Sequence, residues 1–165
     1  MTEPTDLERR VRAIEDRREI EDVIIRYANA CDFQDDEMLL SCFTDDATAS
    51  FAGVPAGPGG AAIVAFLASL RGMPITGSMH RFGSVVVNID GDEADVQSRA
   101  VVYGVRGDPL QLRLRSITYH DRFVRTAQGW RIARREHSPS WEGAAENVPL
   151  TPIARPQPDG SPHAG

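Results

Sequence analysis

The spacing of the hydrophobic residues changes from a helical to an extended period near Ser78, and this change constrains the fold more than any other feature of the sequence. Upstream, apolar residues recur at the spacing that places side chains on one side of an α-helix, as at Ile20, Ile24, Tyr27 and Cys31. Downstream, the spacing is that of extended strands. The sequence therefore predicts helices first and strands afterwards.

The expected elements follow from this pattern. We expect helices at residues 20–32, 36–43 and 61–70, a short strand at 47–51, and four longer strands at residues 79–89, 94–105, 110–125 and 130–137. Asp90-Gly91-Asp92 is a strong hairpin signal between the first two long strands. Helices followed by a strand meander predict an α+β fold. We expect a cone-shaped barrel, in which the N-terminal helices pack on the concave face of a curved, bulged antiparallel sheet.

The third long strand changes its parity partway along. Leucines at positions 110, 112 and 114 share one side, whereas Ile117, Tyr119 and Phe123 share the other. A β-bulge near Arg115-Ser116 would restore a single buried face. The sequence thus predicts an irregularity in the middle of the sheet.

The first residues leave two alternatives open. A helix is expected to start at Thr5 or Asp6, but Leu7, Val11 and Ile14 point away from the later apolar stripe on an ideal helical wheel. The segment therefore forms either two helices or one long helix whose first turns pack elsewhere, for example on a second subunit.

Length and composition exclude several classes of protein. A chain of 165 residues predicts one domain, here residues 1–145, followed by a proline-rich tail at residues 146–165. The net charge of −6 argues against a nucleic-acid-binding protein. All 18 basic residues are arginine, which excludes any mechanism that uses a lysine side chain.

The two cysteines and the apolar runs bear on the cellular compartment. Cys31 and Cys42 do not form a Cys-x-x-Cys pair, and we expect buried free thiols in a reducing environment. No apolar run approaches the roughly 20 residues of a membrane span, and no basic-then-apolar leader is present. We expect a cytoplasmic protein that does not contact a membrane.

Asp32 and His80 are the first candidates for a functional site. Asp32 ends the apolar stripe of the first helix and therefore lies at the rim of whatever that helix covers. Its structural alternative is a cap for the helix that starts near Asp35. The alternative for His80 is a surface residue of an edge strand, because both faces of its strand are mixed. The histidines lack the close spacing of zinc motifs, so no metal site is expected.

Several short motifs, in order, carry a family resemblance. They are RYANACD at residues 26–32, FTDDA at 43–47, Met79-His80, DGD at 90–92, YHDRF at 119–123 and GWRI at 129–132. Together they resemble the SnoaL-like branch of the nuclear-transport-factor-2-like superfamily over residues 7–141. Within it the chain looks similar to scytalone dehydratase, bile acid 7α-dehydratase and hexachlorocyclohexane dehydrochlorinase.

The resemblance implies a set of site residues. Asp32 and His80 stand where those lyases place a catalytic aspartate and histidine. Tyr27 matches a contributing tyrosine of the bile acid enzyme, and Arg135 is similar in placement to an arginine of the dehydrochlorinase. The expected substrate-binding residues are Tyr103, Tyr119, His137, Phe51 and Trp141. The second aspartate of the bile acid enzyme falls opposite Tyr103, so that constellation is incomplete.

The implied function is a cofactor-independent lyase. An Asp–His dyad would perform a dehydratase-like β-elimination on a small apolar, cyclic, hydroxylated or carbonyl compound. Two alternatives remain: a non-catalytic domain that binds a small molecule, and an isomerase or cyclase that uses the same dyad. The resemblance also implies a homodimer or homotrimer that associates through the outer face of the sheet.

Overall fold

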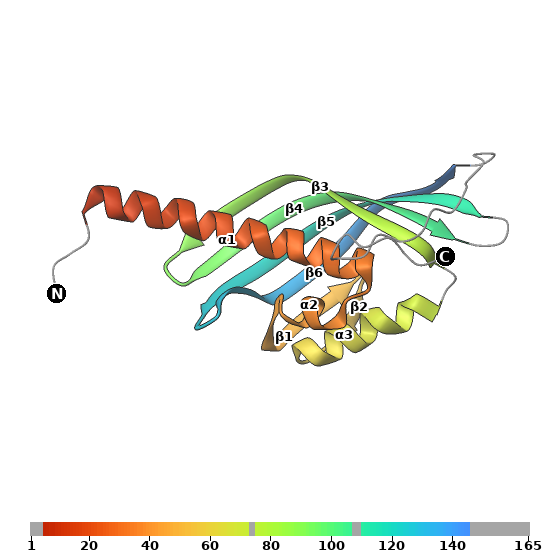
Figure 1. Ribbon diagram of the computed structural model, residues 1–165, viewed down its shortest axis with the longest axis horizontal. Coiled ribbons are helices and arrows are strands. Elements are labelled where there is room, and N and C mark those ends of the chain that lie inside the picture. Colours follow the sequence, from red (N-terminus) through yellow and green to blue (C-terminus); the bar gives the residue numbers. More distant parts are fainter. Residues whose placement is uncertain (1–4, 73–74, 107–109, 146–165) are drawn as a thin grey trace, which may run out of the picture.

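In the described part of the chain, three α-helices and a six-stranded sheet follow the order that the spacing predicts, with one further short strand, at Val54–Ala56, that the spacing did not predict (Figure 1). The computed structural model describes residues 5–72, 75–106 and 110–145, so the proposed tail at 146–165 lies outside the described residues. The elements are α1 (Asp6–Phe33), α2 (Asp36–Leu40), β1 (Phe43–Phe51), β2 (Val54–Ala56), α3 (Gly60–Ser69), a 3-10 turn η1 (Leu70–Gly72), β3 (Ile75–Asp90), β4 (Glu93–Arg106), β5 (Gln111–Thr126) and β6 (Gly129–Ala145).

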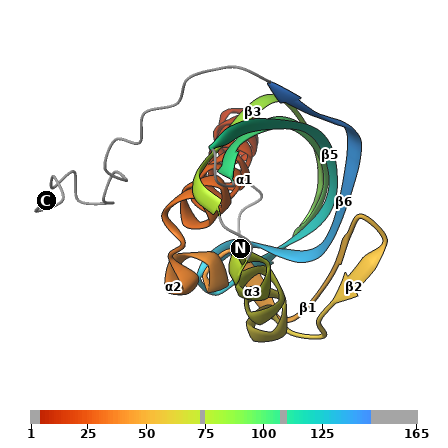
Figure 2. The same ribbon diagram turned by 90° about the vertical axis from the view of Figure 1, so that its right-hand side faces the viewer.

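The sheet is mixed and curled, and it does not close. Its strand order is β2-β1-β6-β5-β4-β3. Strands β3 to β6 form the expected antiparallel meander, whereas β1 runs parallel to β6. The expected antiparallel meander is therefore confirmed, and the sheet as a whole is mixed because β1 joins β6 in parallel. Viewed from the end, the strands curl into an incomplete ring, and α1 lies beside β3 (Figure 2).

The hairpin between β3 and β4 forms where the sequence predicts it. Asp90 pairs with Glu93, which leaves a two-residue loop of Gly91 and Asp92. Gly91 has a φ of 61°, a left-handed conformation that glycine adopts without a steric cost. A tight turn here sets the register of the long β3–β4 ladder.

The predicted bulge lies at the expected level of the sheet but on a different strand. Strand β5 pairs with β4 without interruption, and the register shift between Ser116 and Ile117 arises in the pairing with β6, where Ser140 is the extra residue. The parity of β5 is therefore not restored. Arg113 and Arg115 stay on the inner face with Ile117, because no residue is inserted into their own strand.

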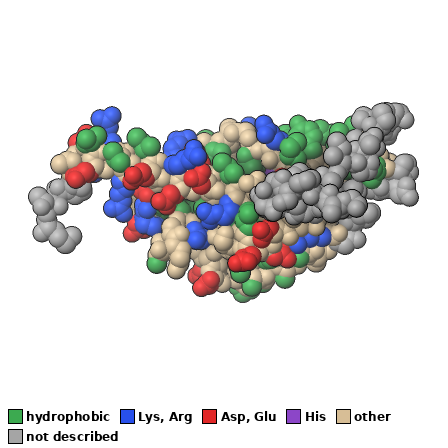
Figure 3. Space-filling view, viewed as in Figure 1, with side chains coloured by type: hydrophobic (Ala, Val, Ile, Leu, Met, Phe, Trp, Pro, Cys, Tyr) green, Lys and Arg blue, Asp and Glu red, His purple; other side chains and the backbone are tan. Residues whose placement is uncertain are grey.

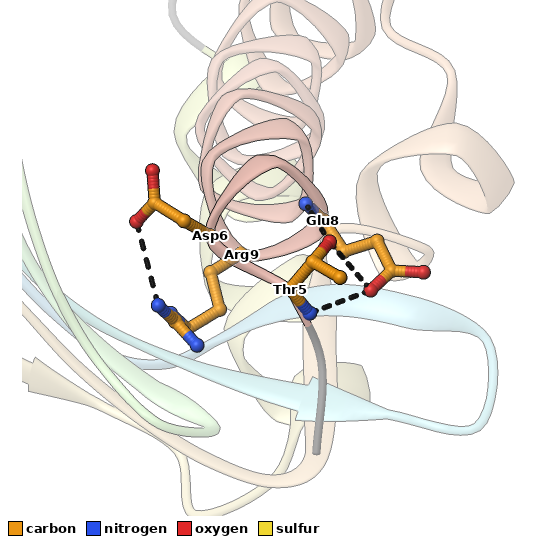
Figure 4. A network of polar contacts seen from close by, with 4 residues as sticks. All are labelled: Thr5, Asp6, Glu8 and Arg9. Atoms are coloured by element: carbon orange, nitrogen blue, oxygen red, sulfur yellow. Dashed lines mark hydrogen bonds and ion pairs between the residues drawn. The ribbon is translucent and has the colours of Figure 1, made fainter. Parts of the chain in front are cut away.

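α1 is a single helix of 28 residues. Of the two alternatives for the first residues, one long helix is therefore correct. A capping box starts it: the Thr5 hydroxyl accepts a hydrogen bond from the Glu8 backbone N–H, and the Glu8 carboxylate accepts one from the Thr5 backbone N–H (Figure 4). Asp6 and Arg9 add an ion pair in the same turn at 3.4 Å. These contacts stabilise the start of the helix, upstream of the residues that pack against the sheet.

The first turns of α1 extend beyond the sheet (Figure 1). Leu7 and Ile14 are 68% and 70% exposed, and hydrophobic side chains appear among charged ones on this part of the surface (Figure 3). The predicted divergence of the two apolar faces is confirmed. Association of these turns with a second subunit stays a prediction.

Asp16 marks the position at which α1 meets the sheet. This buried carboxylate accepts a hydrogen bond from Trp130 Nε1 at 3.2 Å and pairs with Arg125 at 2.6 Å. These contacts hold the pKa of Asp16 below its ordinary value, chiefly through Arg125. Downstream of this anchor, Ile20, Val23 and other stripe residues are buried in the core.

Two further expectations can be compared with the structure. Cys31 and Cys42 are free thiols, as predicted; Cys42 is fully buried, whereas Cys31 is only partly buried. Across the described part of the chain, none of the helices combines the length and the apolar character that crossing a bilayer demands.

Candidate active site

The end of α1 leaves Asp32 free for a contact with the sheet. Gln34 ends the helix in a left-handed conformation with a φ of 58°. Asp35 caps α2, because its carboxylate accepts a hydrogen bond from the Met38 backbone N–H at 2.8 Å. The capping role that competed with a functional role for Asp32 is therefore filled by Asp35.

Asp32 and His80 are in direct contact. His80 Nδ1 lies 2.7 Å from Asp32 Oδ1, and the His80 backbone N–H donates to Oδ2 at 2.8 Å. The Ser78 hydroxyl donates to Oδ1 at 3.0 Å. Strand β3 is the edge of the sheet, so the carboxylate satisfies a backbone donor that no neighbouring strand pairs. The side chains of Asp32 and His80 are only 15% and 13% exposed.

These contacts determine the charge of the carboxylate. Burial by itself would raise the pKa of Asp32, but the hydrogen bonds from the His80 side chain, the His80 backbone and Ser78 outweigh burial and lower it. An ionised carboxylate accepts only, so Nδ1 carries the proton that it receives. In the neutral imidazole the lone pair is then on Nε2, at the other edge of the ring.

His80 borders a cavity of about 370 Å³ inside the curl of the sheet, whereas Asp32 contacts His80 but does not line this cavity itself. Its lining includes five of the residues that the sequence singled out, namely Tyr27, His80, Phe51, Tyr119 and His137. Apolar side chains from α3 and from the end of α1 complete one wall, for example Phe66, Leu67 and Cys31. A mostly apolar hollow with a few polar groups is typical of small-molecule sites.

Two predicted substrate-binding residues lie elsewhere. Val102 and Gly104 of β4 line the cavity, so Tyr103 between them projects to the opposite face of the sheet. Trp141 follows the extra residue of the β6 bulge and is 53% exposed. Neither side chain lines the cavity.

Arg135 lies behind the cavity wall. Its guanidinium makes a bidentate ion pair with Asp121, at 2.8 and 2.7 Å, and both side chains are 0% exposed. The same group lies 4.0 Å from the centre of the Tyr27 ring and 4.6 Å from that of Tyr119. Arg135 thus supports two tyrosines of the cavity wall from the rear.

His137 presents a buried imidazole to the cavity. Its ring packs against Phe51 at 5.5 Å and Tyr119 at 5.4 Å, and its Nδ1 has no hydrogen-bond partner among the described residues. Burial, with the nearby charges of Arg115 and Arg135, lowers the pKa of His137 to about 4. The imidazole is therefore neutral in the folded protein near neutral pH.

This lowered pKa predicts a pH dependence of stability. Between the ordinary value of 6.5 and about 4, unfolded His137 binds a proton that the folded state excludes, so stability falls as the pH falls through this window. The melting temperature of His137→Gln should therefore fall less than that of the wild type between about pH 7 and about pH 4.5. His120→Gln, on the exposed side of β5, should behave like the wild type. Parallel curves for all three proteins would contradict the prediction.

Sequence reasoning missed several residues of this site. Ser78 shares the Asp32 carboxylate with His80, and Arg106, Arg113, Arg115 and Glu142 line the mouth of the cavity. Arg113 and Arg115 alternate in step with Ile117 along the strand, and this alternation was the sequence signal that could have placed them on the cavity side. The expected bulge in β5 assigned them to the outer face instead. His120 is exposed on the other side of the same strand.

The comparisons with known proteins agree with this architecture. Residues 12–136 match the model of the SnoaL-like domain family. The uncharacterized protein Rv2910c of Mycobacterium tuberculosis is 33% identical over 130 residues, which cover 76% of this chain and 86% of that protein.

Solved structures show the same fold. An NTF2-like protein with a cystatin-like fold from Novosphingobium aromaticivorans has a TM-score of 0.71 and 31% identity, over 85% of this chain and 92% of that one. The hexachlorocyclohexane dehydrochlorinase LinA-type3 from Novosphingobium barchaimii has a TM-score of 0.78 over 90% of this chain and 99% of that one, but the identity is 15% and supports the fold alone. A family match that spans most of the chain, on a sheet that curls as in NTF2-like structures, establishes that this protein belongs to the SnoaL-like domain family.

Proposed function

We propose that this protein is a cofactor-independent lyase that removes water or a similar leaving group from a small cyclic compound by β-elimination. The observation that supports it most strongly is the 2.7 Å contact between Asp32 and His80 at the wall of a largely apolar cavity. A histidine oriented by a buried carboxylate is suited to remove a proton from carbon. LinA-type3, which shares the fold, is named a dehydrochlorinase, and loss of hydrogen chloride is an elimination of this kind.

The proposed reaction begins with proton transfer to His80. Nε2 takes the proton from the carbon next to a carbonyl group, and the electrons of the broken C–H bond form a double bond as the C–O bond to the β-hydroxyl breaks. The imidazolium gives its proton to the departing oxygen, which leaves as water. Atoms and electrons balance without a cofactor. Asp32 keeps Nδ1 protonated and stabilises the imidazolium that forms.

Tyr27 is the proposed hydrogen-bond donor to the substrate carbonyl. Burial raises the pKa of its hydroxyl, so the group stays protonated and can donate. The Arg135 cation below the ring acts in the opposite sense and makes the hydroxyl a stronger donor. Arg135 is therefore a positioning residue, which acts on the substrate through Tyr27 and Tyr119.

An assay in D₂O tests this function directly. Cyclic 3-hydroxyketones and 3-chloroketones of one or two rings are incubated with the protein, and proton NMR follows both loss of the leaving group and deuterium uptake at the carbon next to the carbonyl. A lyase produces the conjugated ketone. Deuterium uptake without loss of the leaving group indicates an isomerase-type proton transfer. Binding with neither change over the whole panel would overturn the proposal.

Replacing Tyr27 by phenylalanine should lower the turnover of such a substrate about tenfold, the loss expected for one hydrogen bond to developing charge. The aromatic packing is retained, because Phe43, His80 and Tyr119 contact the ring edge-on. The initial rate of enone formation, read by its ultraviolet absorbance, checks this prediction. Unchanged turnover in Tyr27→Phe would remove the hydroxyl from the mechanism.

A further inference from the structure

The cavity has a polar end that an apolar substrate does not need. Arg106 at the end of β4, Arg113 and Arg115 on β5, and Glu142 on β6 line its mouth. All four side chains project from the inner face of the sheet, on the same side as Ile117 and Tyr119. The site therefore continues from an apolar interior into a charged rim.

The charges at this rim do not balance. Arg115 pairs with Glu142 at 2.5 Å, and Arg113 lies 3.8 Å from the same carboxylate. Within the described ranges, Arg106 Nε is buried and has no hydrogen-bond partner. Three guanidinium groups thus share one lining carboxylate. Arg71 also lines the cavity, but Asp36 neutralises it through an ion pair at 2.5 Å.

The buried Arg106 Nε–H, which has no acceptor among the described residues, suggests that a bound ligand supplies the missing acceptor. Leaving a buried polar group unsatisfied is costly, and the penalty is larger for a charged one. Gly104 keeps the space beside it open, because among the described residues a Cβ at that position would meet only Arg106 Nε, at 3.9 Å. Arg106 and Arg113 flank this space, because Arg113 pairs with Gly104 across the strands.

The rim and the dyad are close enough to hold one small molecule. His80 pairs with Val102, Val102 with Arg115, and Arg115 with Glu142, so these residues form one rung across the sheet. Two strand spacings, about 10 Å, separate the backbones of His80 and Arg115. Arg113 and Arg106 lie two and four residues from this rung, about 7 and 13 Å further along their strands. Their long side chains line the same cavity as His80, so a two-ring compound with a substituent spans the distance between the base and these arginines.

We propose that the substrate carries an anionic oxygen group, which the guanidiniums of Arg106 and Arg113 bind at the mouth of the cavity while the ring system lies against the dyad. This inference rests on the proposed function for the reacting end of the molecule. Planar guanidinium groups bind carboxylates and phosphates through paired hydrogen bonds. A carboxylate on the ring is the smallest group that fits this description.

Isosteric probes separate charge from shape. Binding of 2-naphthoate, 2-naphthyl phosphate and neutral 2-naphthamide is measured by isothermal titration calorimetry on the wild-type protein. The carboxylate should bind at least about tenfold more tightly than the amide, the difference expected for a charge-assisted hydrogen bond. Its affinity should fall as salt is raised, whereas that of the amide should not. The phosphate probe shows which of the two anionic groups the rim prefers.

Two variants locate the effect. Arg106→Gln and Arg113→Gln should each weaken naphthoate binding several-fold to about tenfold and leave naphthamide binding within about twofold. Arg99→Gln, on the exposed outer face of β4, is the matched control and should change neither. Equal binding of naphthoate and naphthamide, equal losses for both probes in the variants, or no binding of any probe would each overturn the proposal.

The binding measurements test the anion site independently of turnover. Asp32→Asn should retain the preference for the carboxylate while it loses turnover. If the preference for the anion is present but no substrate is turned over, the proposed function fails and the anion site stands. If neutral hydroxyketones are turned over and carboxylates are not bound, the anion site fails and the lyase assignment stands.

Discussion

Replacing His80 by alanine is expected to lower kcat for an eliminated substrate by a factor of about 10² to 10⁴, the usual contribution of a general base. His80 lies at the wall of the cavity, and its Nδ1 is engaged by Asp32, so Nε2 is the nitrogen available to the substrate. Of the histidines in the described residues, none is equivalent to His80, because His137 is packed between aromatic rings and His120 is exposed. Steady-state kinetics of the best substrate of the D₂O assay measures the effect.

A double-mutant cycle with Asp32→Asn gives this experiment its control. If Asp32 acts through His80, the two substitutions together should lower kcat hardly more than His80→Ala alone. Asp35→Asn is the matched variant, because Asp35 is a carboxylate three residues away that caps α2 and asparagine caps equally well. His120→Ala should likewise retain activity. Full activity in His80→Ala, or equally large losses in Asp35→Asn, would contradict the dyad.

Replacing Asp121 by asparagine should have the largest effect on stability. The substitution leaves the guanidinium of Arg135 fully buried without its counter-ion, and breaking such a pair typically costs about 3 to 5 kcal/mol. Arg135 Nη1 already lacks a hydrogen-bond partner among the described residues, so no nearby group takes over from the carboxylate. Equilibrium unfolding in urea measures the change in the free energy of unfolding.

Two variants test the cause of this loss. Asp95→Asn removes an exposed carboxylate that pairs with Arg122 at 2.9 Å, and it should cost less than about 1 kcal/mol. The double variant Asp121→Leu/Arg135→Met removes both charges together and should be considerably more stable than Asp121→Asn. If Asp121→Asn were no less stable than Asp95→Asn, the buried pair would not stabilise the fold as described.

Local pattern was sufficient for most of the elements. The apolar stripe at Ile20 and Ile24 and the turn at Gly91 depend on backbone conformations that neighbouring residues determine. The structure confirms both predictions. The end of α2 was misjudged: Phe43 fits the helical spacing but belongs to β1, where it pairs with Ile132 of β6. Partners far along the chain outweighed local spacing at that position.

The candidate site was only partly accessible from the sequence. Strand parity did not separate His80 from a surface position, and only the family resemblance singled out the pair with Asp32. The sequence also suggested Tyr103 and Trp141, which the pleat of β4 and the bulge of β6 direct away from the cavity. The resemblance also singled out Arg135, whose guanidinium is covered by Asp121 on the neighbouring strand.

The sequence alone determined the order of helices and strands, the apolar face of α1 and the position of Asp32 at its end, because these depend on spacing within one segment. The tertiary structure decided which strand carries the bulge, which arginine is buried with Asp121 and which arginines border the cavity. These depend on register between strands that are distant in the chain, where one inserted residue moves every following side chain to the other face.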